Sequence, residues 1–250
     1  MNPFDLTGKV AIVTGGNGGL GLGIARGLAG AGARLTIVGR DAEKSHNAAA
    51  SIGPEVQVLT ADLAIEADCA RVIREVVDHH GRLDILVNNA GTTVRKPPQD
   101  LSLDEWRSVI DVNLTAAFLL CRAAYPSLSV AGGKVVNVAS INAIFGSSYA
   151  SAYASSKGGL VALTRSLALA WAADNIQVNA ILPGWFDTEL TRRGRAEVPG
   201  LDEKVRARVP AGRWADPEEL AGTAIWLASR ASDFVTGASI AVDGGFSVAP

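Results

Sequence analysis

Three side chains stand at spacings that would allow proton transfer: the hydroxyl of Ser140, the phenol of Tyr153 and the amine of Lys157. Tyr153 and Lys157 are four positions apart in a predicted helix, so they share one face. A free phenol titrates near about 10 and is a poor base at neutral pH. A nearby lysine cation favours the phenolate, which moves the pKa of Tyr153 toward the working range of a general acid/base. Alone, the pair could equally be chance neighbours on an ordinary helix.

Short apolar runs alternate with helical patterns and predict the elements that position these residues. One helical stripe runs from Cys69 through Val72, Ile73 and Val76. The predicted strands are Val10–Thr14, Leu35–Val38, Val56–Thr60, Ile85–Asn88, Lys134–Val138, Val178–Leu182 and Ile240–Val242. Near-continuous apolar strands joined by crossover helices form a parallel sheet that is covered on both faces. The sequence therefore predicts an α/β fold, a doubly wound Rossmann-type sheet of seven parallel strands.

Composition and charge exclude several classes of protein. The 250 residues carry 23 Lys and Arg against 25 Asp and Glu, a formal net charge of −2, without the basic cluster that binds nucleic acid or a membrane surface. Hydrophobic residues make up 48% and charged residues 19%, which suits a large buried core rather than disorder. No linker-like tract interrupts the chain, so we expect residues 1–250 to form one domain.

Cysteine and histidine positions do not follow the spacing of a metal site. Cys69 and Cys121 lie far apart in apolar stretches, and His46, His79 and His80 include no pair at ligand spacing. We therefore expect buried cysteines and no metal. The N-terminus lacks a basic region followed by an apolar segment, and no apolar run approaches the roughly 18 residues that span a bilayer. These features favour a cytoplasmic protein.

Residues 186–210 interrupt the alternation of strands and helices before the last strand. The segment contains Arg192, Arg193 and Arg195. It is either a solvated helix pair on the surface or a mobile lid over a substrate, because long insertions in compact domains are often functional. Its place in the fold favours the lid.

A glycine-rich turn joins the first strand to a helix. The strand is followed directly by Gly15, Asn17, Gly19, Leu20 and Gly21. Glycines allow a sharp turn and bring backbone N–H groups against a pyrophosphate at the positive end of the helix dipole. Glycines also serve ordinary tight turns, but strand, turn and helix occur here in the order that a dinucleotide site requires.

The residue at the end of the second strand indicates which of the two nicotinamide dinucleotides is bound. A carboxylate there binds the ribose 2′-hydroxyl, whereas an arginine pairs with a 2′-phosphate. This strand ends with Gly39, Arg40 and Asp41, and we interpret Asp41 as the N-cap of the next helix. Arg40 therefore favours NADP(H), with NAD(H) the alternative because the glycine turn supplies no second basic residue. Asp62, followed by Leu63 at the end of the third strand, is placed for the adenine or could cap the next helix.

Together with further motifs, these features make the chain resemble the short-chain dehydrogenase/reductase family over essentially its full length. The matching residues are Thr14 with the turn glycines, Asn88 to Gly91, Asn113, Ser140, Tyr153 with Lys157, Pro183 with Gly184 and Thr188, and Val242 to Gly245. The resemblance implies hydride transfer between a nicotinamide cofactor and a carbon that bears oxygen.

The resemblance also implies a role for each matched residue. Tyr153 would donate and accept the proton, Ser140 would orient the carbonyl, and Lys157 would hold the nicotinamide ribose. Asn113 would anchor a water relay. The adenosine side would be lined by Asn89, Ala90 and Gly91. The nicotinamide would meet Pro183, Gly184 and Thr188.

Within the family, the stretch Pro183 to Thr191 is similar to sugar-acid dehydrogenases of the gluconate 5-dehydrogenase and 2-deoxygluconate 3-dehydrogenase type. Two basic pairs could meet a substrate carboxylate, or could be solvated surface charges: Arg95 with Lys96, and Arg192 with Arg193. The expected substrate contacts are Arg95, Ser140, Asn142, Tyr153 and Trp185.

Two other functions stay open. A 3-oxoacyl-thioester reductase acting on acyl carrier protein would share every catalytic residue. A non-catalytic dinucleotide-binding regulator would lack Tyr153 or Lys157, and both are present. By resemblance, the helical stretches Asp111 to Tyr125 and Ser151 to Ala173 form the subunit interfaces of a homotetramer.

Overall fold

The centre of the molecule is one sheet of seven parallel strands. The computed structural model describes residues 2–249. The strands are β1 (Val10–Thr14), β2 (Arg34–Gly39), β3 (Gln57–Thr60), β4 (Ile85–Asn88), β5 (Gly133–Val138), β6 (Ile176–Pro183) and β7 (Ser239–Val242). Their order across the sheet is β3-β2-β1-β4-β5-β6-β7, and every neighbouring pair is parallel. The predicted doubly wound fold is confirmed, and each predicted strand overlaps an observed one.

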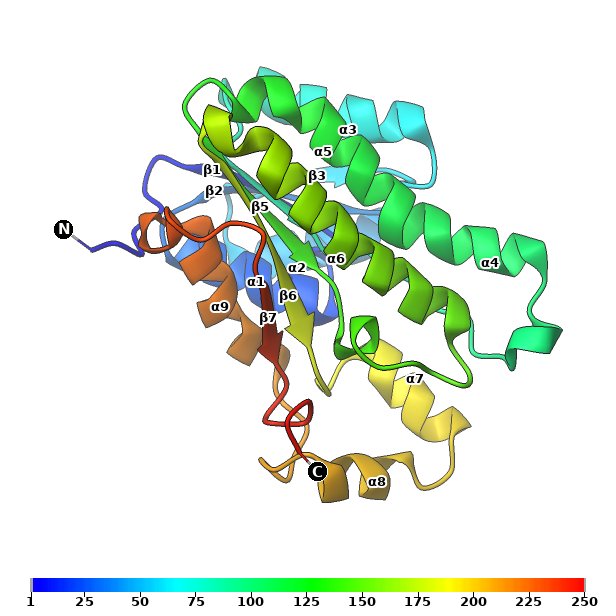
Figure 1. Ribbon diagram of the computed structural model, residues 1–250. Coiled ribbons are helices and arrows are strands. Elements are labelled where there is room, and N and C mark those ends of the chain that lie inside the picture. The colour runs from blue at the N-terminus through cyan, green and yellow to red at the C-terminus, as the bar shows by residue number, and fades with distance from the viewer. Residues whose placement is uncertain (1, 250) are drawn as a thin grey trace.

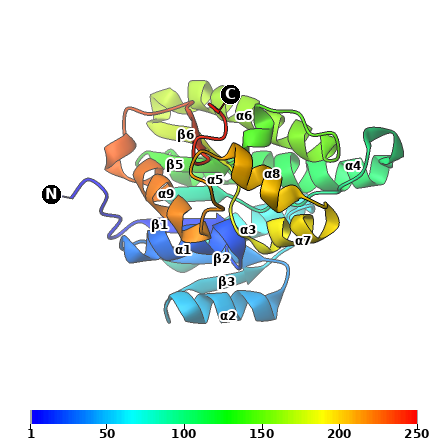
Figure 2. The ribbon, with the colours of Figure 1, turned by 90° about the horizontal axis from the view of Figure 1, so that it is seen from below.

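Helices cover both faces of this sheet (Figures 1 and 2). One face carries α1 (Gly19–Gly30), α2 (Ala42–Ile52) and α9 (Ala221–Ala228). The other carries α3 (Glu66–His80), α4 (Leu103–Ile110), α5 (Ala116–Leu128) and α6 (Ser151–Trp171). Successive side chains of a strand point to opposite sides, so Ala11 and Val13 of β1 pack with α1 and α9. Val10 and Ile12 pack with α3 and α5.

The apolar stripe predicted in α3 is buried, which explains why this helix forms. Cys69, Val72, Ile73 and Val76 all lie in the core, packed with α5 and the sheet. Cys69 and Cys121 are buried free thiols, as predicted. Burial raises the pKa of Cys69 to about 11 and that of Cys121 to about 12. Neither thiol is therefore a nucleophile at neutral pH.

Helices α4 and α5 join into one continuous helix, Leu103–Leu128, through a π-helical turn at Asp111–Thr115. By length and composition this helix could cross a membrane, although the sequence led us to expect no such segment. Its residues Ala116, Leu120 and Ala124 are buried in the core against α3 and the sheet. A core helix passes the same test, so the length of this helix carries no argument for a membrane span.

The strand order reverses between β1 and β4, and the candidate site lies at this point of the sheet. The connection after β1 leads to α1 on one face, and the connection after β4 leads to α4 and α5 on the other. Diverging connections leave a crevice at the carboxyl ends of the strands. Residues 186–210 contain α7 (Glu189–Glu197) and α8 (Leu201–Arg208), which lie at this end of the molecule, outside the sheet and its helix layers (Figure 1).

At the opposite end of the strands, the buried carboxylate of Asp84 holds β1 and β4 together. Its Oδ2 accepts hydrogen bonds from the Val10 backbone N–H at 2.9 Å and from Arg82 Nε at 2.8 Å, and its Oδ1 lies 3.3 Å from Lys9 Nζ. Burial alone would raise the pKa of Asp84, but these donors and cations outweigh it and hold the pKa below its ordinary value. The ionised form is therefore bound more favourably in the folded state.

Asp84→Asn is expected to lower the free energy of unfolding near pH 7 by about 1–3 kcal/mol, because a charge-assisted contact is replaced by a weaker one. The folded-state pKa lies below the unfolded value of about 3.9, so this contribution is present above that pH and is lost as the pH falls through the folded pKa. Denaturant unfolding between pH 7 and pH 3 measures it. Exposed Glu55 supplies a control variant, Glu55→Gln, and an equal loss for both variants would contradict the role of Asp84.

Candidate active site and cofactor pocket

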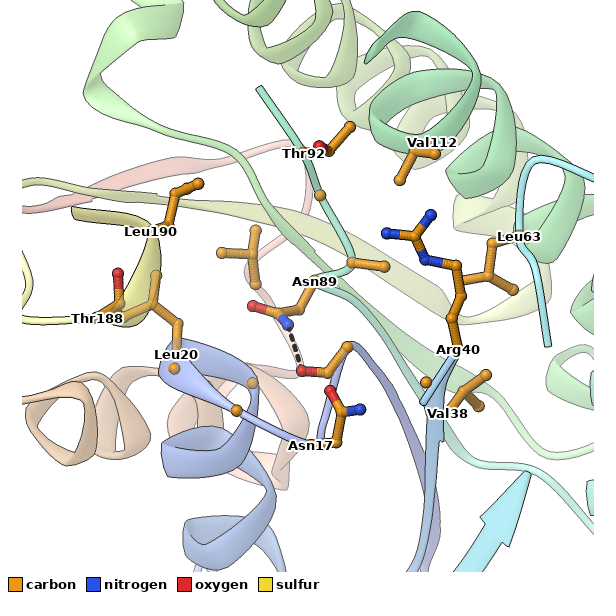
Figure 3. Close-up of a pocket in the computed structure, with 18 of the residues that line it drawn as sticks. Asn17, Leu20, Val38, Arg40, Leu63, Asn89, Thr92, Val112, Thr188 and Leu190 are labelled. Carbon is orange, nitrogen blue, oxygen red and sulfur yellow. Dashed lines mark hydrogen bonds between the residues drawn. The ribbon is translucent and has the colours of Figure 1, made fainter. Parts of the chain in front are cut away.

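The crevice is a cavity of about 570 Å³, a size suited to a cofactor or small ligand (Figure 3). The predicted cofactor residues that line it are Gly15, Asn17, Gly19, Leu20, Gly21, Arg40, Asp62, Leu63, Asn89, Ala90, Gly91, Tyr153, Lys157 and Thr188. Most of the predicted cofactor set is therefore brought together in one place.

Two predicted cofactor residues, Pro183 and Gly184, do not line the cavity. Pro183 is the last residue of β6. Gly184 lies against the chain after β7, where a Cβ built on it would stand 2.6 Å from Asp243 Cβ. These residues lead the chain toward Thr188, and their contact with the cofactor stays a prediction. Thr188 itself lies beside the glycine turn, 3.4 Å from a Cβ built on Gly19 (Figure 3).

The glycine turn has a shape that only glycine allows. Gly15 and Gly19 have φ angles of 63° and 51°, in the left-handed region that favours glycine. A Cβ on Gly21 would lie 2.2 Å from the Gly15 carbonyl oxygen. Asn89 fixes the turn from β4, since its Nδ2 donates to the Thr14 carbonyl at 2.9 Å and to the Gly15 carbonyl at 3.3 Å. The resulting open backbone at the start of α1 fits a pyrophosphate.

After β2, Asp41 caps the next helix, and both Arg40 and Asp41 line the cavity. The Asp41 carboxylate accepts the Lys44 backbone N–H at 3.0 Å, so it is the predicted N-cap of α2. Arg40 extends its guanidinium into the cavity (Figure 3). At Gly39 a side chain would clash, because a Cβ built there would stand 2.4 Å from Asn17 Nδ2 and 2.7 Å from Ser45 Oγ.

Asp62 follows β3 and lines the cavity together with Leu63. It is not the cap of α3, since the N-cap position is Ile65 and carries no side-chain cap. Its Oδ1 instead accepts the Ala64 backbone N–H at 3.1 Å, which closes a short turn. Of the two alternatives for Asp62, the helix cap is therefore wrong.

Ser140, Tyr153 and Lys157 meet at the carboxyl end of β5. Ser140 follows the strand, and α6 carries Tyr153 and Lys157 on one face. Lys157 is 3% exposed, and its ammonium donates to the Val138 carbonyl at 2.7 Å. It lies 5.7 Å from the centroid of the Tyr153 ring. The three groups predicted from residue type and spacing do form one cluster.

The electrostatics of this cluster differ from the expectation that Lys157 lowers the pKa of Tyr153. Burial raises the pKa of Tyr153, and the hydrogen bond with Ser140 and the charge of Arg95 oppose that rise only in part. Burial lowers the pKa of Lys157 to about 8. The physical reason is that the lysine amine points to the Val138 carbonyl rather than to the phenol oxygen. The phenol of Tyr153 is thus protonated and neutral at pH 7.

Asn113 lies in the π-helical turn and is buried. Its Nδ2 donates to the Thr92 carbonyl and to Ser156 Oγ, each at 3.0 Å, and its Oδ1 accepts the Thr92 backbone N–H at 2.8 Å. The extra residue of a π turn turns a side chain out of the regular helical register. The Asn113 side chain therefore joins the segment after β4 to α6, beside Tyr153.

Of the predicted substrate residues, Tyr153 alone lines the cavity within the part of the chain that the structure describes. Asn142 donates its backbone N–H to Ser140 Oγ at 3.1 Å, so it orients that hydroxyl. Trp185 packs edge-on against Trp214 at 5.3 Å between ring centroids, and its buried Nε1 lacks a hydrogen-bond partner within residues 2–249. Asn142 and Trp185 thus border the site rather than the cofactor cavity.

The basic side chains proposed for a substrate carboxylate are engaged with acidic partners. Arg95 pairs with Glu197 at 3.0 Å and donates to the Leu190 carbonyl at 3.1 Å, so it links the segment after β4 to α7. The remaining pairs are Lys96 with Glu105, Arg192 with Asp187, and Arg193 with Glu189. Of these cations, Arg95 is the one whose charge acts on Tyr153.

Several cavity residues were missed by the sequence analysis: Lys44, Thr92, Val112, Glu189 and Leu190. Thr92 and Val112 could have been inferred, because they adjoin Gly91 and Asn113. Lys44 and Glu189 carried no local signal, since their ion pair joins the start of α2 to the start of α7, far apart in the sequence.

Known proteins show the same pattern along the whole chain. A family model described as Enoyl-(Acyl carrier protein) reductase matches residues 15–247. The 2-dehydro-3-deoxy-D-gluconate 5-dehydrogenase of Dickeya dadantii (strain 3937) is 38% identical over 249 residues, which cover 98% of this chain and 98% of the relative. The chain belongs to the short-chain dehydrogenase/reductase family.

Other members extend this similarity to structure. The 5-keto-D-gluconate 5-reductase of Escherichia coli (strain K12) is 38% identical over 252 residues and covers 98% of each chain. The crystal structure of a gluconate 5-dehydrogenase from Burkholderia cenocepacia J2315, in complex with NADP and tartrate, has a TM-score of 0.94 at 37% identity and covers 100% of this chain and 99% of that one. This short-chain dehydrogenase/reductase is an oxidoreductase that binds a nicotinamide dinucleotide.

Proposed function

We propose that this short-chain dehydrogenase/reductase interconverts a secondary alcohol and a ketone on a sugar acid of the gluconate or 2-deoxygluconate type. The observation that carries the proposal is the placement of Tyr153, which lines the cofactor cavity and is acted on by the charge of Arg95. A guanidinium whose charge reaches the proton donor suits a substrate that carries both a carbonyl and a carboxylate. The relatives named for gluconate-type substrates support the same substrate class.

In this proposal Tyr153 is the general acid/base. During reduction its phenol gives its proton to the oxygen of the former carbonyl, and during oxidation the phenolate takes that proton from the alcohol. The cofactor, when bound, supplies or accepts the hydride. Ser140 donates its hydroxyl to the substrate oxygen, and Asn142 holds Ser140 in place through the 3.1 Å bond from its backbone. The geometry aligns donor and substrate before transfer.

Lys157 and Asn113 support this proton transfer. The Lys157 ammonium has three donors, of which one is bound to the Val138 carbonyl, so two are left for the hydroxyls of the nicotinamide ribose. With a pKa of about 8 it is a cation at neutral pH. Asn113 positions the chain around a water path to Lys157, and Thr188 stands at the nicotinamide end of the cavity. Gly91 keeps that path open, since a Cβ built on it would stand 3.3 Å from Asn113 Oδ1 and 3.7 Å from Lys157 Nζ.

Residues 186–210 serve as the substrate lid. Helices α7 and α8 extend over the carboxyl end of the sheet, and Arg95 reaches α7 through Glu197 and the Leu190 carbonyl. Substrate that takes the Arg95 guanidinium would replace these contacts. Trp185 lies at the base of this segment and offers its free Nε1–H to a substrate oxygen.

The cofactor of this proposal is NADP(H). Within residues 2–249 Arg40 forms no ion pair, and its guanidinium extends into the cavity at the end of β2 (Figure 3). The 2′-phosphate of NADP(H) matches that guanidinium. Asp41, which follows Arg40 in the sequence, uses its Oδ1 to cap α2.

We also propose a homotetramer assembled through α5 and α6. These helices share a surface hollow of about 210 Å³ lined by Phe118, Arg122, Tyr125, Leu167 and Trp171. Phe118 and Leu169 are exposed large apolar side chains on the same two helices. Apolar surface of this kind marks an interaction site, and a symmetric copy of the same helices is its complement.

The test is a panel of substrates with purified protein, followed through the nicotinamide absorbance. Each cofactor is paired with gluconate, 2-deoxygluconate, 5-ketogluconate and an acetoacetyl thioester. We expect turnover of a sugar acid, with NADP(H) preferred. Activity on the thioester alone would replace the proposal with a 3-oxoacyl-thioester reductase, and binding of cofactor without turnover of any substrate would leave a dinucleotide-binding regulator.

A further inference from the structure

Lys44 brings a second cation to the cofactor cavity that Arg40 also lines. It is the third residue of α2, and its side chain lines the cavity. A Cβ built on Gly18 of the glycine turn would stand 3.2 Å from Lys44 Cε and 3.3 Å from Lys44 Nζ. The ammonium therefore lies against the turn itself, at a place where the turn sequence offers no basic residue.

Two aspartates also line this cavity, and neither forms an ion pair with Arg40 or Lys44 within residues 2–249. The Asp41 carboxylate is occupied by the Lys44 backbone N–H at 3.0 Å. The Asp62 carboxylate closes its own turn through Ala64. Arg40 and Lys44 both line the cavity, and Glu189 is the one carboxylate that forms an ion pair with either side chain within residues 2–249.

The Lys44–Glu189 ion pair spans the mouth of the cavity. Lys44 Nζ lies 2.8 Å from Glu189 Oε2, across a sequence separation of 145 residues. Glu189 begins α7, and its Oε1 accepts from Arg193 at 2.5 Å. The side chains of Lys44 and Glu189 are 45% and 57% exposed, so the pair contributes little stability. A phosphate with a charge near −2 is a stronger partner for an ammonium than this carboxylate.

We propose that Lys44 is a specificity-determining residue for the 2′-phosphate of NADP(H), and that Glu189 competes with the phosphate for its ammonium. When the phosphate binds, the Lys44 ammonium leaves Glu189 and pairs with the phosphate. Glu189 stays paired with Arg193. The first turn of α7 is then no longer tied to α2. The inference rests on the NADP(H) preference proposed above and deepens it. The glycine turn has no basic residue to pair with the 2′-phosphate beside Arg40, and Lys44 of α2 supplies that second cation.

Direct binding of NADPH and NADH to the full chain, followed by fluorescence titration without substrate, tests this role. Lys44→Met is expected to weaken NADPH by about three- to tenfold, the range for one charge-assisted contact at a half-exposed site, and to leave NADH within about twofold. Glu189→Gln is expected to tighten NADPH by about two- to fivefold, because it removes the competing carboxylate. In the double variant the gain from Glu189→Gln should vanish, because Lys44 is the group that it releases.

The chain offers a matched control in the ion pair of Arg26 with Glu218. These side chains are 41% and 61% exposed and lie 2.8 Å apart, and neither lines the cavity. Arg26→Met should leave the affinity for both dinucleotides unchanged. A loss in Arg26→Met equal to that in Lys44→Met would mean that a broken surface pair alone explains the effect, and would overturn the inference.

Three outcomes at Lys44 and Glu189 would also overturn it. Equal weakening of NADH and NADPH by Lys44→Met would assign the ammonium to the pyrophosphate instead of the 2′-phosphate. Unchanged NADPH affinity in Lys44→Met would remove the contact altogether. Weaker NADPH binding in Glu189→Gln would contradict the competition.

Arg40→Ala separates a failure of this inference from a failure of the proposed cofactor. If Arg40→Ala selectively weakens NADPH while Lys44→Met does not, the NADP(H) preference stands and the role of Lys44 falls. If wild-type protein binds NADH and NADPH alike and neither variant changes this, the proposed preference itself falls. The sugar-acid substrate is judged separately, because no substrate is present in these titrations.

Discussion

Tyr153→Phe is expected to lower kcat by about 10²–10⁴-fold in both directions, the usual contribution of a positioned general acid/base. The change removes one phenol oxygen and leaves the ring in place, so the fold and the cofactor cavity should persist. The affinity for NADPH should stay within about twofold, because Arg40 and the glycine turn carry the cofactor contacts in our proposal. Initial rates by nicotinamide absorbance and binding by fluorescence titration measure the two effects.

The same substitution at Tyr149 provides a control for Tyr153→Phe. Tyr149 is exposed and does not line the cavity. Tyr149→Phe should keep wild-type turnover. Wild-type kcat in Tyr153→Phe would remove Tyr153 from the mechanism, and a matching loss of NADPH affinity would show that its hydroxyl serves the cofactor rather than the substrate.

Gly21→Ala is expected to disable the cofactor site through the backbone alone. The added Cβ would stand 2.2 Å from the Gly15 carbonyl oxygen and 2.4 Å from Asn89 Nδ2, so the turn and the end of β4 must separate. Overpacking of this kind costs about 1–3 kcal/mol, which corresponds to a fall in Tm of about 2–4 °C per kcal/mol for a chain of this size. We expect NADPH affinity to fall by about tenfold or more, since the backbone N–H groups lose their arrangement.

Gly30, the last residue of the same helix, gives the comparison for Gly21→Ala. Nothing lies within 4 Å of a Cβ built there. Gly30→Ala should change the free energy of unfolding by no more than about 0.5 kcal/mol and leave NADPH affinity intact. Thermal unfolding and fluorescence titration of both variants decide the matter. Normal NADPH binding by Gly21→Ala would mean that the turn is not the pyrophosphate site.

The strands were predictable because each is a nearly continuous apolar run that ends in glycine or polar residues. β1, whose five residues are all buried, was predicted from Val10 to Thr14 and observed with those bounds. β6 was predicted too short at both ends, since Ile176 and Pro183 extend it. Buried polar residues in the middle of strands, such as Asn137 and Asn179, were no obstacle, because their side chains find partners across the core.

The site was predictable where its residues are close in sequence or lie at strand ends. Parallel strands bring their carboxyl ends to one edge, so Gly15, Arg40 and Asn89 could be placed in one cavity without a structure. The side-chain pairings could not be placed this way. Arg95 with Glu197, and Lys44 with Glu189, join segments about a hundred residues or more apart, and those contacts depend on how α7 packs.

The pKa of Tyr153 shows a second limit of the sequence. A spacing of four residues on a helix puts Lys157 on the same face, but it does not fix the direction of a flexible side chain. The Val138 carbonyl takes the ammonium, and burial then dominates the pKa of the phenol. A backbone acceptor offers no sequence signal, since every residue has one.

The contacts of Asn113 give the active site a reporter of its own. The backbone N–H of Thr92 belongs to no strand and is held by the Oδ1 of Asn113, a buried side chain. An amide proton held in this way exchanges with solvent only when its local structure opens. Exchange at Thr92 therefore measures how often the catalytic side of the pocket opens, whereas exchange at β5 or β6 measures how often the sheet itself does.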